Sequence, residues 1–253
     1  MIYWRVSALT FGLLSFFWCG QLVLAAEIRV AVASNFTHAM TEIARQFESV
    51  SGHQVVLVFG STGKHYAQIR HGAPFDVFFA ADARRPQMLE DDGQIVAGSR
   101  FTYAIGRLVL WCPDGRVDVE NGSALAGQGF RHLAIANPRL APYGRAARQV
   151  LEAMGHWDKL QQRIVRGENI AQAHQFVASG NAEIGFVAYS QIMRPGQTPS
   201  GAYWLPSGDF HEPIVQQAVQ LTPRLASTAF LDFVKSEKVQ AIVARYGYDI
   251  AGE

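Results

Sequence analysis

The chain has 253 residues, of which 49% are hydrophobic and 17% are charged, and it contains 2 cysteines. This composition excludes a disordered chain and a small disulfide-stabilised peptide, and the length suffices for one large domain or two lobes. The formal net charge is +1 and no run of Lys and Arg occurs, which argues against a nucleic-acid-binding protein because such proteins carry a basic face.

The N-terminal segment has the pattern of a secretory signal peptide. Arg5 precedes an apolar stretch over residues 8–18, and Val23 and Ala25 place small residues at −3 and −1 of a cut after Ala25. Polar and glycine residues interrupt the apolar stretch, which argues against a retained membrane anchor. We therefore expect residues 1–25 to be removed on export.

Strand-like and helix-like segments alternate along the rest of the chain. Residues 28–33, 55–59 and 75–80 have the length and composition of buried strands, and apolar residues recur at helical spacing between them. This order predicts a parallel sheet with helices on its faces. The pattern repeats further along, with strands expected at residues 107–111, 132–136, 184–188, 203–205 and 214–221. We therefore predict an α/β protein with two lobes.

Small polar residues collect at four strand-to-helix junctions, at residues 34–35, 61–62, 137–144 and 168–170. In open α/β folds, ligands bind beyond the carboxyl ends of the strands, where helix N-termini present free N–H groups. Each junction alone could be an ordinary helix cap. Four of them together favour the binding of a small anion.

Sequence motifs of common enzymes and metal sites do not occur. There is no Cys-x-x-Cys, His-Glu-x-x-His or Gly-x-Ser-x-Gly, and residues 60–64 (Gly-Ser-Thr-Gly-Lys) lack the spacing of a phosphate-binding loop. Cys112, which would be the one cysteine left after cleavage, lies in an apolar run and is expected to be a small core residue. We therefore expect a protein that is not an enzyme and that has no cofactor and no directly bound metal.

The junction motifs, taken in order with several other segments, resemble the periplasmic molybdate-binding proteins of ATP-driven (ABC) molybdate importers. The resemblance covers essentially the whole chain after the signal segment. It rests on residues 32–40, 59–69, 73–82, 135–144, 155–158, 168–170 and 245–248.

The resemblance implies a two-lobed periplasmic binding protein of type II, in which each lobe is a mainly parallel sheet flanked by helices. Molybdate or tungstate would be held in the cleft between the lobes and delivered to the membrane permease and ATPase of the importer. We expect a periplasmic monomer, with lobe I formed by residues 26–105 and 218–253 and lobe II by residues 106–217. Hinges are expected near residues 104–107 and 212–217.

The resemblance also assigns contacts with the anion to both lobes. In lobe I they fall on Ser34, with Asn35 beside it as a further donor, and on Ser61 or Thr62 in the second loop. In lobe II they fall on Tyr143 and on Ile170, which can donate only its backbone N–H. The complete predicted set is Ser34, Asn35, Ser61, Thr62, Tyr143 and Ile170.

One position departs from the family pattern. Some members carry a tyrosine where this chain has Ala188, and strand alternation should turn the next residue, Tyr189, to the opposite face. We expect Tyr143, which replaces a smaller residue, to supply the missing hydroxyl. Lys64 should point to solvent.

A cage of hydroxyl and N–H donors suits an anion that is fully deprotonated at neutral pH, such as molybdate, tungstate or sulfate. Helix N-termini can balance the charge without a Lys or Arg contact. The alternatives are a receptor for sulfate or another tetrahedral oxyanion, a less favoured ferric receptor, and an exported hydrolase. The hydrolase would pair Ser34 or Ser61 with His38 or His65.

Overall fold

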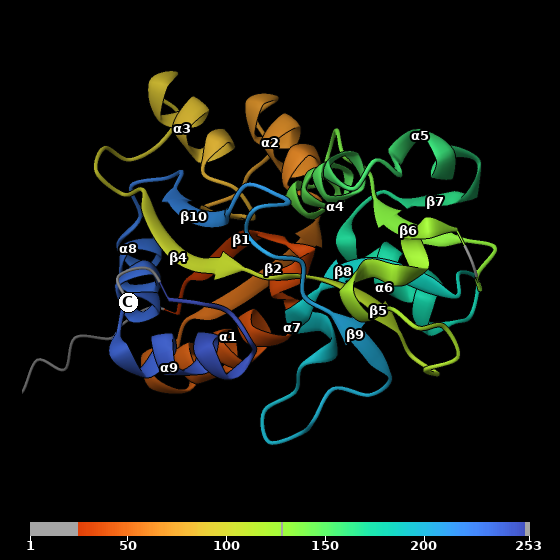
Figure 1. Cartoon of the computed structure of the whole chain (residues 1–253). Helices are drawn as coiled ribbons and strands as arrows, with labels where there is room; N and C mark the ends of the chain where they lie inside the picture. The colour runs from red at the N-terminus through yellow and green to blue at the C-terminus, as the bar shows by residue number, and fades with distance from the viewer. Residues whose placement is uncertain (1–24, 128, 251–253) are drawn as a thin grey trace, which may run out of the picture.

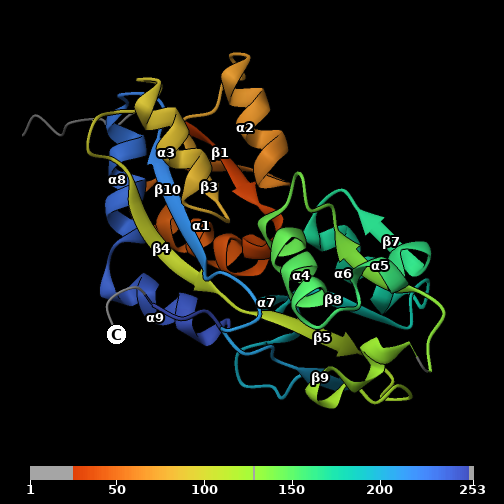
Figure 2. The ribbon, with the colours of Figure 1, turned by 45° about the horizontal axis from the view of Figure 1, so that its top comes forward.

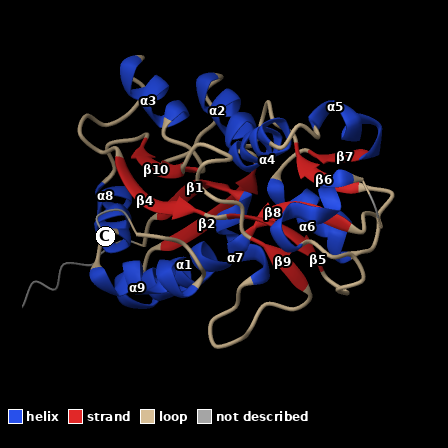
Figure 3. Cartoon of the chain, viewed as in Figure 1, coloured by secondary structure: helices blue, strands red, loops and turns tan. Residues whose placement is uncertain are grey.

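The computed structural model describes residues 25–127 and 129–250. The predicted signal segment therefore lies, apart from Ala25, outside the described residues. Within the described ranges, no helix is both long enough and apolar enough to span a membrane. The strands form two separate sheets, and helices cover both of them (Figure 3).

The first sheet has five strands in the order β2-β1-β3-β10-β4. Neighbours β2, β1 and β3 are parallel, whereas β10 is antiparallel to both β3 and β4. Helices α1, α8 and α9 pack on one face of this sheet, and α2 and α3 pack on the other (Figure 1). The elements are β1 (Glu27–Ala33), α1 (Thr37–Ser51), β2 (Gln54–Gly60), α2 (Thr62–Arg70), β3 (Val77–Ala80), α3 (Arg84–Asp91), β4 (Phe101–Gly106), β10 (Ile214–Gln220), α8 (Leu225–Val234) and α9 (Glu237–Arg245), with a short 3-10 helix, η1 (Ser34–Phe36), after β1.

The second sheet also has five strands, in the order β7-β6-β8-β5-β9. Strand β6 is parallel to β7 and β8, whereas β5 is antiparallel to β8 and β9. Helix α4 packs on one face of the sheet, and Val177 of α6 packs on the other. The elements are β5 (Leu108–Cys112), η2 (Glu120–Ala126), β6 (Leu133–Ala136), α4 (Pro142–Ala153), α5 (Trp157–Leu160), η3 (Gln161–Arg163), β7 (Ile164–Gly167), α6 (Ile170–Ala178), β8 (Ile184–Ala188), α7 (Tyr189–Ile192) and β9 (Ala202–Trp204).

The predicted α/β fold with two mainly parallel sheets is confirmed, and each sheet contains one reversed strand. The reversed strands are β5 and β10, the strands by which the chain enters one lobe from the other. Figure 2 shows β4 running on into β5, with only Arg107 between them. The predicted boundary at residues 217 and 218 falls inside β10, which pairs in the first sheet along its whole length. We therefore propose that lobe I resumes at Ile214.

Candidate functional site

The six residues of the predicted site are all buried where the two lobes meet, and none is more than 5% exposed. Each lies at the start of a helix that follows a strand. Ser34 and Asn35 open η1, Ser61 and Thr62 open α2, Tyr143 lies in the first turn of α4, and Ile170 opens α6. Figure 2 shows the end of β1 and the start of α2 next to α4.

Helix caps leave backbone N–H groups free at this interface. The Ser61 hydroxyl caps α2 by accepting from the N–H of Lys64, and Asn169 caps α6 by accepting from the N–H of Gln172. Because the first N–H groups of a helix have no acceptor inside the helix, the N–H groups of Thr62 and Ile170 remain available. These two N–H groups can donate hydrogen bonds to an anion, and the positive ends of their helices can stabilise its charge.

Four buried hydroxyl groups at the site share one hydrogen-bonding pattern. Each accepts a single bond from a protein N–H and, among the bonds of residues 25–127 and 129–250, none donates its own proton. Buried hydroxyls normally have an acceptor, so these four protons are available to a ligand that offers only acceptor atoms. The donor–acceptor distances are 3.4 Å from Ala171 N to Ser34 Oγ, 3.3 Å from Lys64 N to Ser61 Oγ, 3.0 Å from Ala81 N to Thr62 Oγ1 and 3.2 Å from Gln216 Nε2 to the Tyr143 hydroxyl.

Asn35 is placed differently from the hydroxyl residues. Its Nδ2 donates to Gln216 Oε1 at 2.8 Å and to the Tyr248 hydroxyl at 3.0 Å, which uses both of its N–H groups. Its Oδ1 has no partner among the described residues. In this arrangement the Asn35 side chain offers no free donor, so its direct contact with the anion stays a prediction.

The environment of the site is neutral. Burial raises the pKa of the Tyr143 hydroxyl well above its usual value, so this hydroxyl stays protonated and can donate. Lys64 does not reach into the site, because its ammonium group forms an ion pair with Glu168 of the other lobe at 2.9 Å and half of its side chain is exposed. In the described ranges no cluster of three or more His, Cys, Asp or Glu side chains could hold a metal ion.

The two lobes contact each other directly around these residues. The N–H of Gly63 donates to the carbonyl of Leu140 at 2.8 Å, and a Cβ at Gly63 would lie 2.9 Å from the same oxygen. The bond from Ala171 to Ser34 and the pair of Lys64 with Glu168 also cross the interface. The structure is therefore a closed form of the two lobes.

Tyr189 lies at the start of α7, directly after β8. Its ring packs 5.8 Å from the ring of Tyr203, and the Arg107 guanidinium lies 4.9 Å from its centre. These contacts agree with the interpretation of Tyr189 as a packing aromatic. Ala188, at the position where some relatives have a tyrosine, is fully buried at the end of β8.

The histidines that a hydrolase would require are engaged elsewhere. The Nε2 of His38 lies 2.8 Å from a guanidinium nitrogen of Arg194, while His65 contacts Gln68 and the carbonyl of Val32, each at 3.2 Å. Within the described part of the chain, neither histidine is hydrogen-bonded to Ser34 or Ser61. This geometry pairs neither histidine with the serine that the hydrolase alternative requires.

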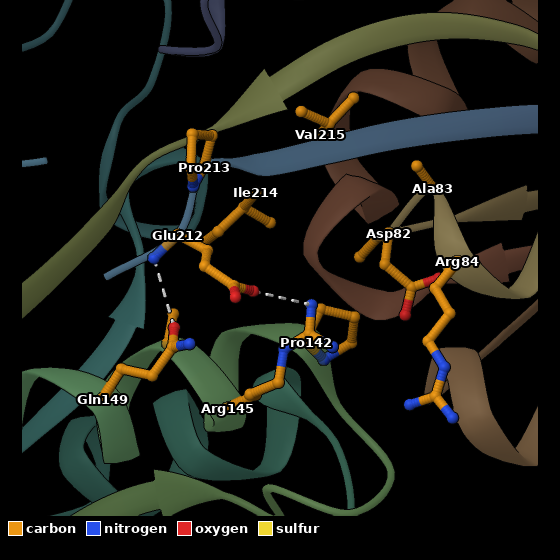
Figure 4. Close-up of a pocket in the computed structure, with 12 residues that line it drawn as sticks. Asp82, Ala83, Arg84, Pro142, Arg145, Gln149, Glu212, Pro213, Ile214 and Val215 are labelled. Carbon is orange, nitrogen blue, oxygen red and sulfur yellow. Dashed lines mark hydrogen bonds and ion pairs between the residues drawn. The ribbon is translucent and has the colours of Figure 1, made fainter.

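A cavity at the interface of the lobes lies beside the site and is lined by other residues (Figure 4). Its walls come from residues 81–84 after β3, from the first turns of α4, and from residues 212–215. At residues 212–215 the chain returns from lobe II to lobe I, which is its second crossing between the lobes. Glu212 connects the crossing to α4, because its carboxylate lies 3.9 Å from Arg145 and its N–H donates to Gln149. The cavity marks the space between the lobes at the second crossing.

Sequence reasoning missed Gln216, which is fully buried and contacts both Asn35 and Tyr143. The sequence signal that could have identified Gln216 is its position in β10. Strand alternation places it on the same buried face as Ile214 and Ala218. A glutamine between apolar residues on a buried face requires polar partners.

Residues 28–249 match the model of a family described as bacterial extracellular solute-binding proteins, and the chain belongs to this family. Its class is therefore that of the two-lobed binding proteins. Within this class the chain is 51% identical to the molybdate-binding protein ModA of Azotobacter vinelandii, over 89% of this chain and 91% of the relative. It is 44% identical to the molybdate-binding protein ModA of Rhodobacter capsulatus, over 88% of each chain.

A solved structure gives the same result. The periplasmic molybdate-binding protein of Azotobacter vinelandii superposes with a TM-score of 0.84 at 45% identity, covering 88% of this chain and 99% of the other. The resemblance predicted from the junction motifs and the predicted two-lobed fold are both confirmed.

Proposed function

We propose that this chain captures molybdate in the periplasm and delivers it to the permease of an ABC importer and its ATPase. The observation that carries this proposal is the set of four buried hydroxyls between the lobes whose protons have no acceptor among the described residues. The likeness to molybdate-binding proteins over nearly the whole chain supports the choice of anion. The protein acts as a monomer, holds tungstate in the same cage, and catalyses no reaction.

The donors suffice for tight binding. A hydrogen bond to a charged group contributes roughly 1.5–3 kcal/mol. The four hydroxyls and the N–H groups of Thr62 and Ile170 would together contribute about 9–18 kcal/mol before the costs of desolvation and closure. Micromolar to nanomolar affinity requires about 8–12 kcal/mol. No side-chain cation is needed in contact with the anion.

Selectivity follows from the size of the cage and the chemistry of its donors. Sulfate is smaller than molybdate and would leave some donors unpaired, and each unpaired buried donor carries a penalty. Phosphate retains a proton near neutral pH, and none of the six residues of the proposed site is a carboxylate that would accept this proton. The site therefore favours large, fully deprotonated tetrahedral oxyanions.

Anion binding also explains the signal to the permease. Ser34, Ser61 and Thr62 belong to one lobe, and Tyr143 and Ile170 belong to the other. The anion makes its full set of bonds only when the lobes are closed, so it shifts the equilibrium toward closure. The permease would then recognise the closed pair of lobes.

Isothermal titration calorimetry of the chain from Ala26 onward with molybdate, tungstate, sulfate and phosphate tests the proposal. We expect molybdate and tungstate to bind with micromolar or tighter affinity, and sulfate and phosphate to bind at least about 100-fold more weakly, since each unpaired donor costs about 1–3 kcal/mol. Tight sulfate binding without molybdate binding would replace the proposed ligand by sulfate. Hydrolysis of a phosphate or sulfate ester that is lost in both His38→Ala and His65→Ala would instead identify a hydrolase.

A further inference from the structure

Gln216 connects the two lobes inside the buried site. It lies on β10, beside the register shift between Gln216 and Gln217 in the pairing with β4. Its Oε1 accepts from Asn35 Nδ2 at 2.8 Å and lies 2.9 Å from the Tyr103 hydroxyl, and its Nε2 donates to the Tyr143 hydroxyl at 3.2 Å. A fully buried amide with this number of partners fixes the orientation of each of them.

The direction of these hydrogen bonds follows from the protons that each group has. The Tyr248 hydroxyl donates its single proton to the backbone carbonyl of Asn35 at 2.8 Å, so its oxygen can only accept from the Asn35 side chain. Asn35 therefore presents Nδ2 to Tyr248 and, with its second N–H, to Gln216. Gln216 must then present Oε1 to Asn35, which turns its Nε2 toward Tyr143.

The direction of these hydrogen bonds determines where the proton of the Tyr143 hydroxyl points. Its oxygen accepts from Gln216, so its proton points away from Gln216, and within the described residues it has no protein acceptor. The side chains of Gln216 and Tyr143 have little room to move, because they pack against the backbone of Gly106. Gly106 ends β4, where the chain first crosses from lobe I to lobe II, and a Cβ there would lie 2.6 Å from Gln216 Nε2 and would overlap the Tyr143 hydroxyl. The backbone of the crossing thus holds the Gln216–Tyr143 bond in place.

We propose that Gln216 is a positioning residue for anion binding. It is the last member of the hydrogen-bonded series Tyr248–Asn35–Gln216, and it directs the Tyr143 proton onto the bound oxyanion. This inference rests on the proposed function and adds a residue of β10 to its site. Because β10 enters lobe I directly after the second crossing, the same side chain links the orientation of the donor to the arrangement of the lobes.

A double-mutant cycle tests the proposal. Molybdate affinity is measured by calorimetry for the wild type, Gln216→Met, Tyr143→Phe and the double variant. We expect each single variant to bind at least about 10-fold more weakly, as for the loss of a hydrogen bond to a charged group. The double variant should lie within about 2-fold of Tyr143→Phe, because Gln216 acts through the hydroxyl that this variant lacks.

Gln217→Met is the matched control. Gln217 is the next residue of β10, and its side chain donates to Thr102 Oγ1 at 3.1 Å and accepts from Arg100 at 2.8 Å. We expect this variant to bind molybdate within about 2-fold of the wild type, since its partners lie outside the site. Equal losses in Gln217→Met and Gln216→Met would show a general effect on the strand and would overturn the proposal.

The other outcomes separate this proposal from the proposed function. Additive losses in the double variant, or unchanged affinity in Tyr143→Phe, would overturn the role of Gln216 while the wild type still binds molybdate. A wild type that does not bind molybdate would overturn the proposed function itself. If Gln216→Met does not fold, Gln216→Glu takes its place, because its carboxylate would accept the Tyr143 proton and add a negative charge. Unchanged affinity in Gln216→Glu would contradict the proposal.

Discussion

Ser34→Ala is expected to lower the affinity for molybdate by about 10- to 150-fold, the equivalent of one hydrogen bond to a charged group. The Ser34 hydroxyl is buried at the end of β1 and its proton has no acceptor in the described structure, so the anion is its natural partner. Its oxygen also accepts from the N–H of Ala171 across the interface at 3.4 Å. The substitution removes a donor to the anion and a contact that holds the lobes together.

Calorimetry with molybdate measures this loss, and Ser49→Ala is its control. Ser49 is an exposed residue on the adjacent helix α1, and its hydroxyl donates to the carbonyl of Gln46. We expect Ser49→Ala to leave the affinity unchanged. If Ser34→Ala binds molybdate as tightly as Ser49→Ala, the Ser34 hydroxyl is not a ligand.

Gly144→Ala is expected to lower the free energy of unfolding by about 3 kcal/mol, at the upper end of overpacking costs. Gly144 lies in the first turn of α4 and packs against the end of β6. An added Cβ would overlap the carbonyl oxygen of Ala136 and lie 2.9 Å from the carbonyl carbon of Asn137. Because both are backbone atoms, α4 would have to move, and Tyr143 would move with it.

Urea denaturation of the anion-free protein measures the change, and calorimetry follows the affinity. Gly208→Ala is the matched control, since among the described residues no heavy atom lies within 4 Å of a Cβ there. Gly208→Ala should be neutral in both measurements. A Gly144→Ala protein as stable as this control would show that α4 can move away from β6 at no cost.

The strands at the centres of the sheets could be predicted from the sequence, whereas two edge strands could not. β3 and β8 are buried along their whole length and β1 is buried from Val30 onward, so they contain short apolar runs that are easily recognised. β4 and β7 pair on one side only and were not predicted, because their sequences are less uniformly apolar. The predicted boundary between the lobes falls inside β10, because no local signal shows to which sheet a strand belongs.

The strand-to-helix junctions that hold the candidate site could be found from the sequence, and the resemblance to molybdate-binding proteins named the residues within them. Ser34, Ser61 and Asn169 stand at strand-to-helix junctions, where a cap and a ligand contact both call for a small polar residue. The partners of those residues could not be predicted in the same way. Gln216 lies 181 positions from Asn35 and 73 from Tyr143, so only the fold brings the three together.

A crystal structure of the chain from Ala26 onward with molybdate tests the central claim most directly. We predict that the anion lies between the lobes, with its oxygens within hydrogen-bond distance of the hydroxyls of Ser34, Ser61, Thr62 and Tyr143 and of the N–H groups of Thr62 and Ile170. An anion bound elsewhere, or held mainly by arginine or lysine side chains, would contradict the account.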